Sequence, residues 1–523
     1  MATVVKSFTI DGIDAIPVDI EATTLDIGGN VSSVSIIGLG DQAVREAGDR
    51  LTAALIHSGY FMPSDKVILN LGPGDLKKRG SHYDLGMAVA LLSETGQIYS
   101  NFNLREFIFI GELSLNGVLR PVNGMISMAA AAAEGHYRYI VVPSENAKEA
   151  AIIENIKVIG VRTLRQLTDL LEDEEMFASS FYTGENGPDS GKTDTADDIF
   201  NNKYEDDFAD VIGQDKAVSG AMYAAAGGHN ILMIGEPGCG KSMIAKRIAG
   251  ILPPMTDAES METTRIHSIA GTYHVTHALM RERPFRAPHN NISMNALIGG
   301  GHDAMPGEIT LAHNGVLFLD ELFEFSKHTL EALRQPLEDK IVTVSRVNRT
   351  NIFPANFMLV AATNPCPCGY YPGSRCRCTP KEVFNYRKQM SGPIMERIDI
   401  NVNMHPIGLN ITPGRKENKS SKTRSSAELR ERVVNARRLQ EERFKGIPGV
   451  TCNAQMTDAM LDDFCPLDSE GARRLERAAL MNSYSPRMVK RTLRLARTIA
   501  DVREHENILA EDVKEACSLK VNL

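Results

Sequence analysis

The 523-residue sequence contains no run of 18 or more apolar residues, which is the length that a membrane-spanning helix requires. Its first residues lack a charged start followed by an apolar core, so no secretory signal is visible. Lys and Arg number 57 against 66 Asp and Glu, and the net charge of −9 excludes a strongly basic coat for non-specific nucleic-acid binding. We therefore expect a cytoplasmic protein without membrane association, whose basic patches are local.

Cysteine is also scarce, because eight residues in a chain of this length are too few for a disulfide framework. Four of them lie together with the spacing C-x-C-x₇-C-x-C, namely Cys366, Cys368, Cys376 and Cys378. Four thiolates bind Zn²⁺ tetrahedrally and close a loop that has no core of its own. The cluster therefore predicts a structural zinc site in a reducing cytosol. Unliganded thiols are the alternative, since C-x-C pairs are tighter than the common zinc spacing.

The hydrophobic fraction of 43% and the charged fraction of 24% are ordinary globular values, and the length predicts about three domains. Residues 179–207 are rich in Gly, Ser, Asp and Asn, and nine acids against two lysines lie between Gly184 and Asp210. Such a segment predicts a flexible acidic linker. A softer boundary lies near residue 413. We therefore expect an N-terminal domain over 1–178, a central domain over 208–412 and a C-terminal domain over 413–523.

The three domains differ in their patterns of apolar residues. The N-terminal domain is expected to be mixed α/β, with strands at 67–71, 107–110 and 139–142 and an alanine-rich helix at 125–133. An Asn-Gly turn at 116–117 predicts a hairpin. Strands and helices alternate in the central domain, which predicts a parallel sheet with helices on both faces. The C-terminal domain shows helical periodicity only.

A glycine-rich motif follows an apolar strand at 231–234 and precedes a helix at 243–249. Its residues are Gly235, Glu236, Pro237, Gly238, Cys239, Gly240, Lys241 and Ser242, followed by Met243. This is G-x-x-x-x-G-K-S in the strand–loop–helix context that a phosphate-binding loop requires. We expect its backbone N–H groups and the helix N-terminus to hold the phosphates of ATP. Lys241 would reach the β- and γ-phosphates, and Ser242 would bind Mg²⁺.

Polar residues follow two further apolar strands of the central domain. Asp320 and Glu321 come after the strand 316–319, and Asn364 follows the strand predicted at 357–362. We expect Asp320 to hold Mg²⁺ and Glu321 to act as the general base on the attacking water. A side chain at Asn364 would sit between the two nucleotide strands and orient that water.

These motifs resemble those of AAA+ ATPases, in the clade of magnesium-chelatase motors and MCM helicases. In that resemblance Arg397 matches the arginine finger and Arg487 the sensor 2 residue. Segment 283–301 matches the strand pair inserted before the acidic strand, and 341–353 matches a second inserted hairpin. Within the clade the chain is similar to the bacterial ComM/YifB family, through motifs such as Arg286-Ala-Pro-His289 and Asn364-Pro-Cys-Pro-Cys-Gly369.

The N-terminal domain is similar to the Lon-protease-like domain of that family through segment 111–122. The catalytic lysine of Lon falls in the helix after Gly124, where this chain has no lysine. Ser81 lies near the nucleophile region, but a serine without a general base is inert. The resemblance thus implies a protease-inactive domain.

The resemblance implies an α/β fold class: a Lon-protease-like domain, a linker, and an AAA+ P-loop ATPase domain with a helical lid. It also implies a homo-oligomeric ring, with hexamers as the family's form, that drives branch migration in homologous recombination and natural transformation. Arg397 would come from the neighbouring subunit. Arg487 is assigned to the chain that binds ATP, although action in cis or in trans stays open.

Contacts to branched or single-stranded DNA are expected from Arg346 and Arg349, because such hairpins face the pore of a ring ATPase. The basic segments 415–445 and 473–503 are more typical of solvated helix faces or subunit contacts. One alternative function is a chelatase-type remodelling ATPase acting on a protein partner. Another is a DNA-binding scaffold or protease descended from Lon, which an intact Glu321 and the missing lysine oppose.

Overall fold

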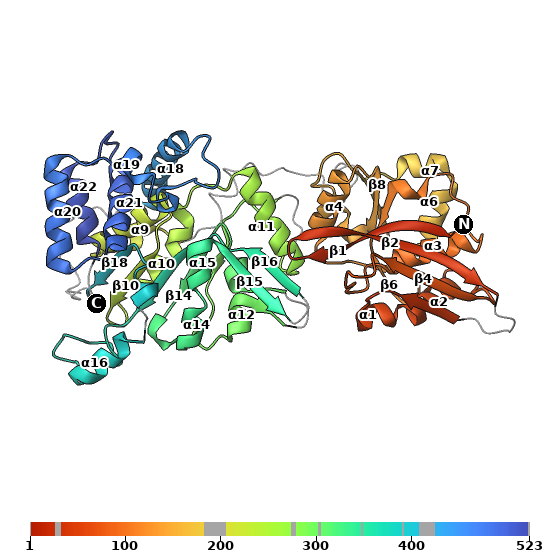
Figure 1. Ribbon diagram of the computed structural model, residues 1–523, viewed down its shortest axis with the longest axis horizontal. Helices are drawn as coiled ribbons and strands as arrows, with labels where there is room; N and C mark the ends of the chain where they lie inside the picture. Colours follow the sequence, from red (N-terminus) through yellow and green to blue (C-terminus); the bar gives the residue numbers. More distant parts are fainter. Residues whose placement is uncertain are drawn as a thin grey trace, which may run out of the picture. The chain divides into compact units, whose positions relative to one another are not determined.

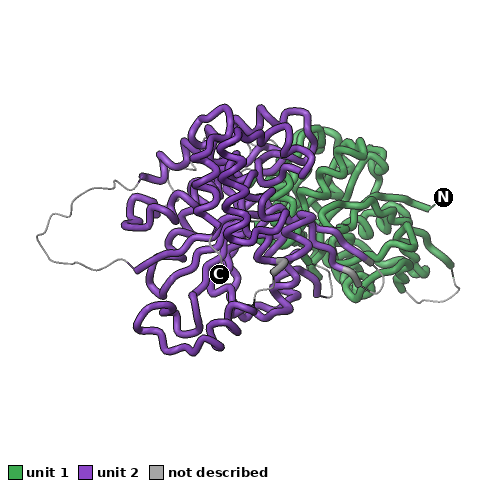
Figure 2. The backbone as a smooth tube through the Cα atoms, turned by 60° about the vertical axis from the view of Figure 1, so that its left-hand side comes forward, with its two compact units in different colours: residues 1–193, 260–280, 302–305 green, residues 194–259, 281–301, 306–523 purple. Residues whose placement is uncertain are grey.

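The computed structural model describes residues 2–26, 33–182, 206–273, 279–301, 305–346, 349–389, 392–406 and 424–520. The chain forms two compact units (Figure 2). Unit 1 comprises residues 1–193, 260–280 and 302–305, and unit 2 comprises the rest. In the described ranges no helix is both long and apolar enough to cross a bilayer. Most of the expected linker, from 183 to 205, lies outside the described residues.

Unit 1 is built on a seven-stranded mixed sheet with the order β3-β4-β2-β1-β5-β8-β9 (Figure 1). Its strands are β1 (Thr3–Asp11), β2 (Asp14–Leu25), β3 (Ser33–Ile37), β4 (Lys66–Gly72), β5 (Phe107–Phe109), β8 (Tyr139–Pro143) and β9 (Lys157–Val161). Strand β2 runs antiparallel to β1 and β4, and the other pairs are parallel. Alternate residues of β5 enter different cores, since Phe107 and Phe109 join one apolar cluster and Ile108 the other.

Helices cover both faces of this sheet. They are α1 (Gln42–Arg45), α2 (Ala47–His57), α3 (Asp84–Glu94), α4 (Met125–Glu134), α5 (Ala147–Ala150), α6 (Leu164–Glu172) and α7 (Glu174–Ser179). The expected hairpin is present as β6 (Glu112–Leu113) and β7 (Leu119–Arg120), with Gly117 at φ 77° in the left-handed region that glycine tolerates. The mixed α/β prediction is confirmed for this unit.

Unit 1 also contains a segment from the middle of the chain. Helix α11 (Asp257–Ile269) supplies Arg265, whose guanidinium donates to the carbonyl of Ile13 at 2.9 Å and to Asp14 at 2.7 Å. The Ser268 hydroxyl donates to Glu149 at 2.5 Å. Residues 260–280 therefore pack with the N-terminal part of the chain, whereas the sequence placed all of 208–412 in one central domain.

Unit 2 is centred on five parallel strands with the order β11-β14-β17-β10-β18. They are β10 (Ile231–Gly235), β11 (Phe285–Arg286), β14 (Val316–Leu319), β17 (Met358–Thr363) and β18 (Ile400–Met404). Strands β10, β14 and β17 are buried along their whole length, as the interior of a parallel sheet requires. The predicted parallel sheet is confirmed.

The inserted strands differ in part from expectation. Strand β11 pairs with β14, so Phe285 and Arg286 belong to the central sheet. The inserted pair is instead β12 (Gly299–Gly300) with β13 (Met305–Pro306). The second inserted hairpin is present, as β15 (Ile341–Arg346) and β16 (Arg349–Pro354) in antiparallel register.

Helices of the central part of unit 2 are α9 (Asp215–Gly227), α10 (Lys241–Ile248), α12 (Met294–Ile298), α13 (Glu308–Leu311), α14 (Lys327–Glu331), α15 (Arg334–Asp339), α16 (Pro380–Arg387) and α17 (Gly392–Met395). The C-terminal part is helical, with α18 (Ser426–Arg443), α19 (Leu461–Phe464), α20 (Ser469–Asn482), α21 (Pro486–Val502) and α22 (Ala510–Ser518). Helix α21 begins at a capped N-terminus: the Ser485 hydroxyl accepts from the Met488 N–H, and Pro486 occupies the first turn.

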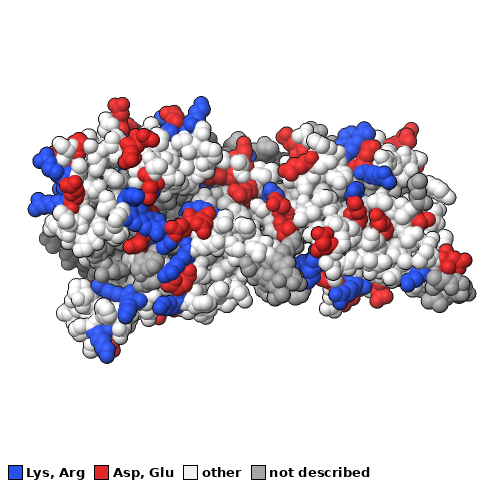
Figure 3. Space-filling model, viewed as in Figure 1, with Lys and Arg blue, Asp and Glu red and all other residues white. Residues whose placement is uncertain are grey.

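Acidic and basic side chains are interspersed on the face drawn in Figure 3, and Lys and Arg gather over unit 2. Positive charge on this face is therefore local, in keeping with the acidic net charge.

Candidate functional site

The glycine-rich motif forms the turn between β10 and α10. Gly238 and Gly240 have φ of 79° and 95°, in the left-handed region where a side chain would be strained. Gly240 directly precedes α10, whose first backbone N–H groups have no partner within the helix. The motif therefore has the backbone geometry of an anion-binding loop at a helix N-terminus.

Lys241 lies under this loop with only 8% of its surface exposed. Its ammonium donates to the carbonyls of Gly235 at 2.7 Å and Glu236 at 3.0 Å, and to the side-chain oxygen of Asn364 at 3.1 Å. Burial lowers the pKa of Lys241, although Asp320 and Glu321 act in the opposite direction. The oxygens that accept from the Lys241 ammonium are neutral. Negatively charged phosphate oxygens in their place would attract the ammonium more strongly.

Ser242 and Asp320 meet at the edge of the sheet. The Ser242 hydroxyl donates to the Asp320 carboxylate at 2.8 Å, and the other carboxylate oxygen accepts from the backbone N–H of Glu321 at 2.9 Å. A hydroxyl and a carboxylate at one point supply the oxygen ligands that Mg²⁺ prefers. The two residues expected to bind Mg²⁺ are thus brought together.

Glu321 follows Asp320 in a left-handed conformation, with φ of 51°. Its carboxylate accepts a hydrogen bond of 2.9 Å from the side-chain amide of Asn290. Sequence reasoning missed this partner, because Asn290 was assigned to the inserted strands. One feature of the sequence could have indicated the contact: Asn290 comes shortly after the short strand β11. The end of that strand lies at the same sheet edge as Asp320 and Glu321.

Asn364 follows β17, which lies between β10 and β14 in the sheet. This order places it between the strand that leads into the P-loop and the strand that delivers Asp320, as the sequence predicted. Lys241, Ser242, Asp320, Glu321 and Asn364 therefore gather at one edge of the sheet.

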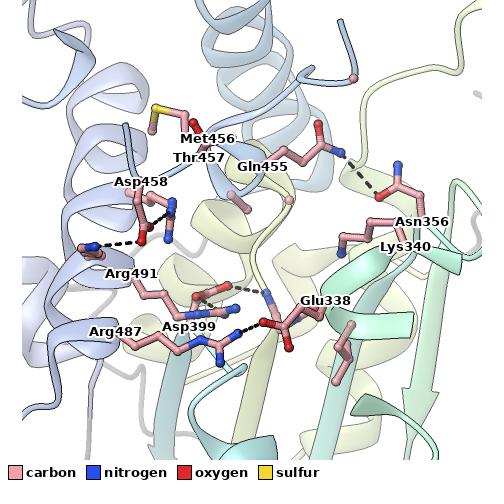
Figure 4. Close-up of a pocket in the computed structure, with 17 residues that line it drawn as sticks. Glu338, Lys340, Asn356, Asp399, Gln455, Met456, Thr457, Asp458, Arg487 and Arg491 are labelled. Atoms are coloured by element: carbon pink, nitrogen blue, oxygen red, sulfur yellow. Dashed lines mark hydrogen bonds and ion pairs between the residues drawn. The ribbon is translucent and has the colours of Figure 1, made fainter. Parts of the chain in front are cut away.

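The two arginines assigned from the resemblance share a different partner. Arg397 and Arg487 both form ion pairs with Glu338 of α15, the latter at 2.6 Å. Burial lowers the pKa of Arg397, and the positive charges of Arg487 and Arg491 lower it further. Figure 4 shows Glu338 and Arg487 pointing toward one another at the rim of a cavity of about 910 Å³, which Asp399 and Arg491 also line.

The four clustered cysteines also converge. The sulfur of Cys366 lies 3.4 Å from that of Cys368 and 3.8 Å from that of Cys376, and Cys368 and Cys376 are 3.6 Å apart. Cys378 completes a group whose sulfurs all lie within 4.8 Å of one another. A zinc ion with four Zn–S bonds of about 2.3 Å has S–S edges of about 3.8 Å. The four thiols therefore suit one tetrahedral zinc ion.

Comparison with known proteins agrees with these features. Family models for magnesium chelatase subunit ChlI match residues 207–410 and 23–146, and the model for its C-terminal part matches 423–520. The chain is 38% identical to protein YifB of Salmonella typhimurium over 509 residues, which is 97% of this chain and 95% of YifB. It is 37% identical to competence protein ComM of Haemophilus influenzae over 482 residues, covering 92% and 91% of the two chains.

The chain belongs to the ComM/YifB family. A partial likeness extends to Lon protease 2 of Bacillus subtilis, with 26% identity over 213 residues, or 34% of this chain and 36% of that protein. The family is magnesium-chelatase-like, and membership confirms the fold class: an AAA+ ATPase domain joined to a Lon-like part. Membership implies a nucleotide and Mg²⁺ as ligands.

The Lon-like part differs from expectation at Ser81. The Ser81 hydroxyl donates to the carboxylate of Glu112, so this serine has an acidic partner that the sequence did not reveal. Glu112 also forms an ion pair with Arg120 at 3.4 Å. Helix α4 carries Met125, Ile126 and Ser127 where the lysine of Lon would fall. An inactive protease site stays a prediction.

The proposed DNA contacts lie at the end of the inserted hairpin. Arg346 of β15 pairs in register with Arg349 of β16, so both stand next to the turn. Their side chains lie outside the described part of the structure. Their role stays a prediction.

Proposed function

We propose that the protein is a ring-forming, cytoplasmic ATPase that moves DNA, and that it drives branch migration during homologous recombination and natural transformation. The observation that carries the proposal is the meeting of Lys241, Ser242, Asp320, Glu321 and Asn364 at one sheet edge, while Arg397 and Arg487 gather on Glu338. A site divided in this way would be completed by a second subunit. The name of competence protein ComM, a relative along most of the chain, supports a role in competence.

In the proposed reaction the P-loop amides and Lys241 hold the β- and γ-phosphates of ATP. Ser242 and Asp320 would hold Mg²⁺, which neutralises phosphate charge when bound. Glu321 takes the proton of the attacking water as general base. Asn364 stays beside Lys241 and orients that water. Hydrolysis by this set is in-line attack of water on the γ-phosphorus, with ADP as the leaving group.

Arg397 and Arg487 are proposed to act together on the ATP of a neighbouring subunit. They share one carboxylate, that of Glu338, so any subunit that presents one presents the other. We therefore propose that Arg487, for which the sequence leaves cis or trans action open, also acts in trans. An arginine supplied in this way stabilises charge on the transferring phosphoryl group, and hydrolysis would require the ring.

DNA is proposed to contact the β15–β16 hairpin through Arg346 and Arg349. Arginines bind phosphates regardless of sequence, as a motor that travels along DNA requires. Branch migration exchanges equal numbers of base pairs. Almost no net pairing energy opposes the motor, so ATP is needed mainly for direction and speed.

The deciding experiment compares ATP turnover with no DNA, single strands, linear duplex and a four-way junction, and follows labelled junctions to products on a gel. We expect turnover to rise most with the junction and products to require ATP. The Glu321→Gln variant is the control for hydrolysis. If DNA changes neither turnover nor junction structure, the second candidate gains: a remodelling ATPase acting on a protein partner, which the magnesium chelatase matches favour.

A further inference from the structure

The segment 366–378, here called the cysteine loop, is in contact with the P-loop. The guanidinium of Arg375 forms an ion pair of 2.6 Å with the carboxylate of Glu236, the first residue after Gly235 in the P-loop. The same guanidinium lies 4.4 Å above the ring of Tyr370. Arg375 is therefore held from two sides, by its own loop and by the loop that is proposed to bind phosphate.

A second close approach lies between the backbone of Gly369 and the ring of Pro237. Gly369 has φ of 85°, and a Cβ built on it would lie 2.7 Å from the ring of Pro237. No side chain larger than hydrogen fits between them without displacing one loop. The cysteine loop also begins two residues after Asn364, which accepts a hydrogen bond from Lys241.

The cysteine loop has almost no core of its own. Of its thirteen residues only Cys366 and Gly369 are buried, and the rest are partly or fully exposed. Its shape must therefore depend on the four thiols at its two ends, which suit one zinc ion. Without a metal, short backbone turns, the contact of Tyr371 with Arg387 and the contacts to Glu236 and Pro237 would remain to fix where Gly369 and Arg375 lie.

We propose that the cysteine loop is a clamp on the P-loop, so that metal occupancy of its four thiols sets the affinity of the ATP site. The proposal rests on the ATP site of the proposed function. The backbone N–H of Glu236 and the ring of Pro237 belong to the loop that is proposed to receive the phosphates, and the Glu236 carbonyl accepts from Lys241 at 3.0 Å. Displacing these residues would alter both the phosphate cradle and the lysine. Arg375 and Gly369 are thus positioning residues.

The test measures two quantities on the full-length protein: zinc per chain by elemental analysis, and the Kd of a fluorescent ATP analogue with Mg²⁺. Cys376→Ser should lose zinc and weaken nucleotide binding about tenfold or more, because the metal supplies the folding energy of such a loop. Arg375→Ala should keep zinc and raise the Kd about two- to fivefold, since its ion pair is partly exposed. Arg375→Lys, which keeps the charge, should fall between.

Arg377→Ala is the matched control. This arginine lies in the same loop, is exposed and has no side-chain hydrogen bond or ion pair within the described residues, so neither zinc nor Kd should change. A double variant, Glu236→Gln with Arg375→Ala, should bind nucleotide no worse than either single variant, because the two changes remove one interaction. If Cys376→Ser does not fold, the same two measurements are made on wild-type protein from which zinc has been removed with a chelator, and again after zinc is added back.

Wild-type nucleotide affinity in a zinc-free protein, or in Arg375→Ala, would overturn the clamp. Additive losses in the double variant would overturn the proposed contact between Arg375 and Glu236. Failure of the wild type itself to bind nucleotide, with Lys241→Ala indistinguishable from it, would instead overturn the ATP site of the proposed function.

Discussion

Asn290 holds Glu321 through a hydrogen bond of 2.9 Å from its side-chain amide to the carboxylate. The donor comes from the segment after β11 and the acceptor from the end of β14, two neighbouring strands. A carboxylate that accepts this bond has one oxygen engaged with a donor other than water. In the absence of ligand, the residue proposed as the general base is thus tethered to a neutral side chain.

We predict that Asn290→Ala raises ATP turnover in the absence of DNA. A net hydrogen bond is worth about 0.5–1.5 kcal/mol, which corresponds to roughly two- to tenfold in rate. A coupled ATPase assay with and without junction DNA measures the change. Asn291→Ala is the control, because the Asn291 side chain contacts His289 and not Glu321. Turnover equal to or below that of wild type would show that the tether does not restrain the base.

Glu321→Gln and Lys241→Ala should separate binding from chemistry. Glutamine keeps the size of Glu321 but cannot take a proton, so ATP should bind normally while turnover falls at least a hundredfold. Lys241→Ala removes the charge that faces the phosphates and should lose nucleotide binding as well. Equilibrium binding of a fluorescent ATP analogue, measured beside turnover, distinguishes the two outcomes. Rapid turnover by Glu321→Gln would move the base to another residue.

Much of the ATP site could be predicted because its signals are local. The P-loop is one strand–turn–helix, and Asp320 and Asn364 each follow an apolar strand. The roles of Asn290 and Glu338 could not be predicted, because no spacing rule links them to their partners. Asn290 is 31 positions from Glu321, and Glu338 is 59 positions from Arg397 and 149 from Arg487. The same limit applies to Arg265 of α11, whose partners Ile13 and Asp14 lie about 250 residues away in the chain.

Action of Arg397 and Arg487 in trans predicts a pattern of rescue when inactive subunits are mixed. Lys241→Ala subunits mixed with Arg397→Ala subunits should regain turnover, because some interfaces join an intact P-loop to an intact arginine. Mixing Lys241→Ala with Arg487→Ala should rescue in the same way. Mixing Arg397→Ala with Arg487→Ala should not, since every interface lacks one arginine. Recovery of turnover in the mixture of Arg397→Ala and Arg487→Ala would contradict the proposal that both arginines act in trans. So would a failure of Lys241→Ala to restore turnover in mixtures with either arginine variant.

The stability of unit 1 should depend on pH through His82. Burial lowers the pKa of His82 to about 4, and its Nε2 lies 2.8 Å from the Phe8 carbonyl as a donor in the neutral ring. Between about pH 6.5 and pH 4, His82 is protonated in the unfolded chain but stays neutral in the folded protein. The contribution of His82 to the free energy of unfolding is therefore fully present above pH 6.5. It decreases as the pH falls, and about 2 kcal/mol is lost at pH 5.

Comparison of the wild type with His82→Gln isolates this contribution. Burial raises the pKa of Asp84 to about 6, so Asp84 acts in the opposite direction, but it is present in both proteins. Hydrogen exchange of β1 peptides at pH 7 and pH 5, corrected for intrinsic rates, gives the free energy of opening. We expect the loss on acidification to be about 2 kcal/mol smaller in the variant. Equal losses would mean that His82 is protonated in the folded state.

Replacing Arg346 and Arg349 together by alanine should uncouple ATP turnover from DNA movement. Both residues stand next to the hairpin turn and neither belongs to the sheet edge that carries Lys241 and Asp320, so basal turnover should survive. DNA affinity should fall, and the slope of log K against log salt should become shallower by about one for each phosphate that the variant no longer binds. Junction processing should fall with it.

The matched control removes two exposed arginines of α18, Arg432 and Arg438, and so the same net charge. If the hairpin arginines bind phosphates, only the hairpin variant should show a shallower slope of log K against log salt and reduced junction processing. If DNA is attracted merely by overall charge, both variants should lose affinity equally. An intact salt slope in the hairpin variant would place the DNA-binding residues on another part of the protein.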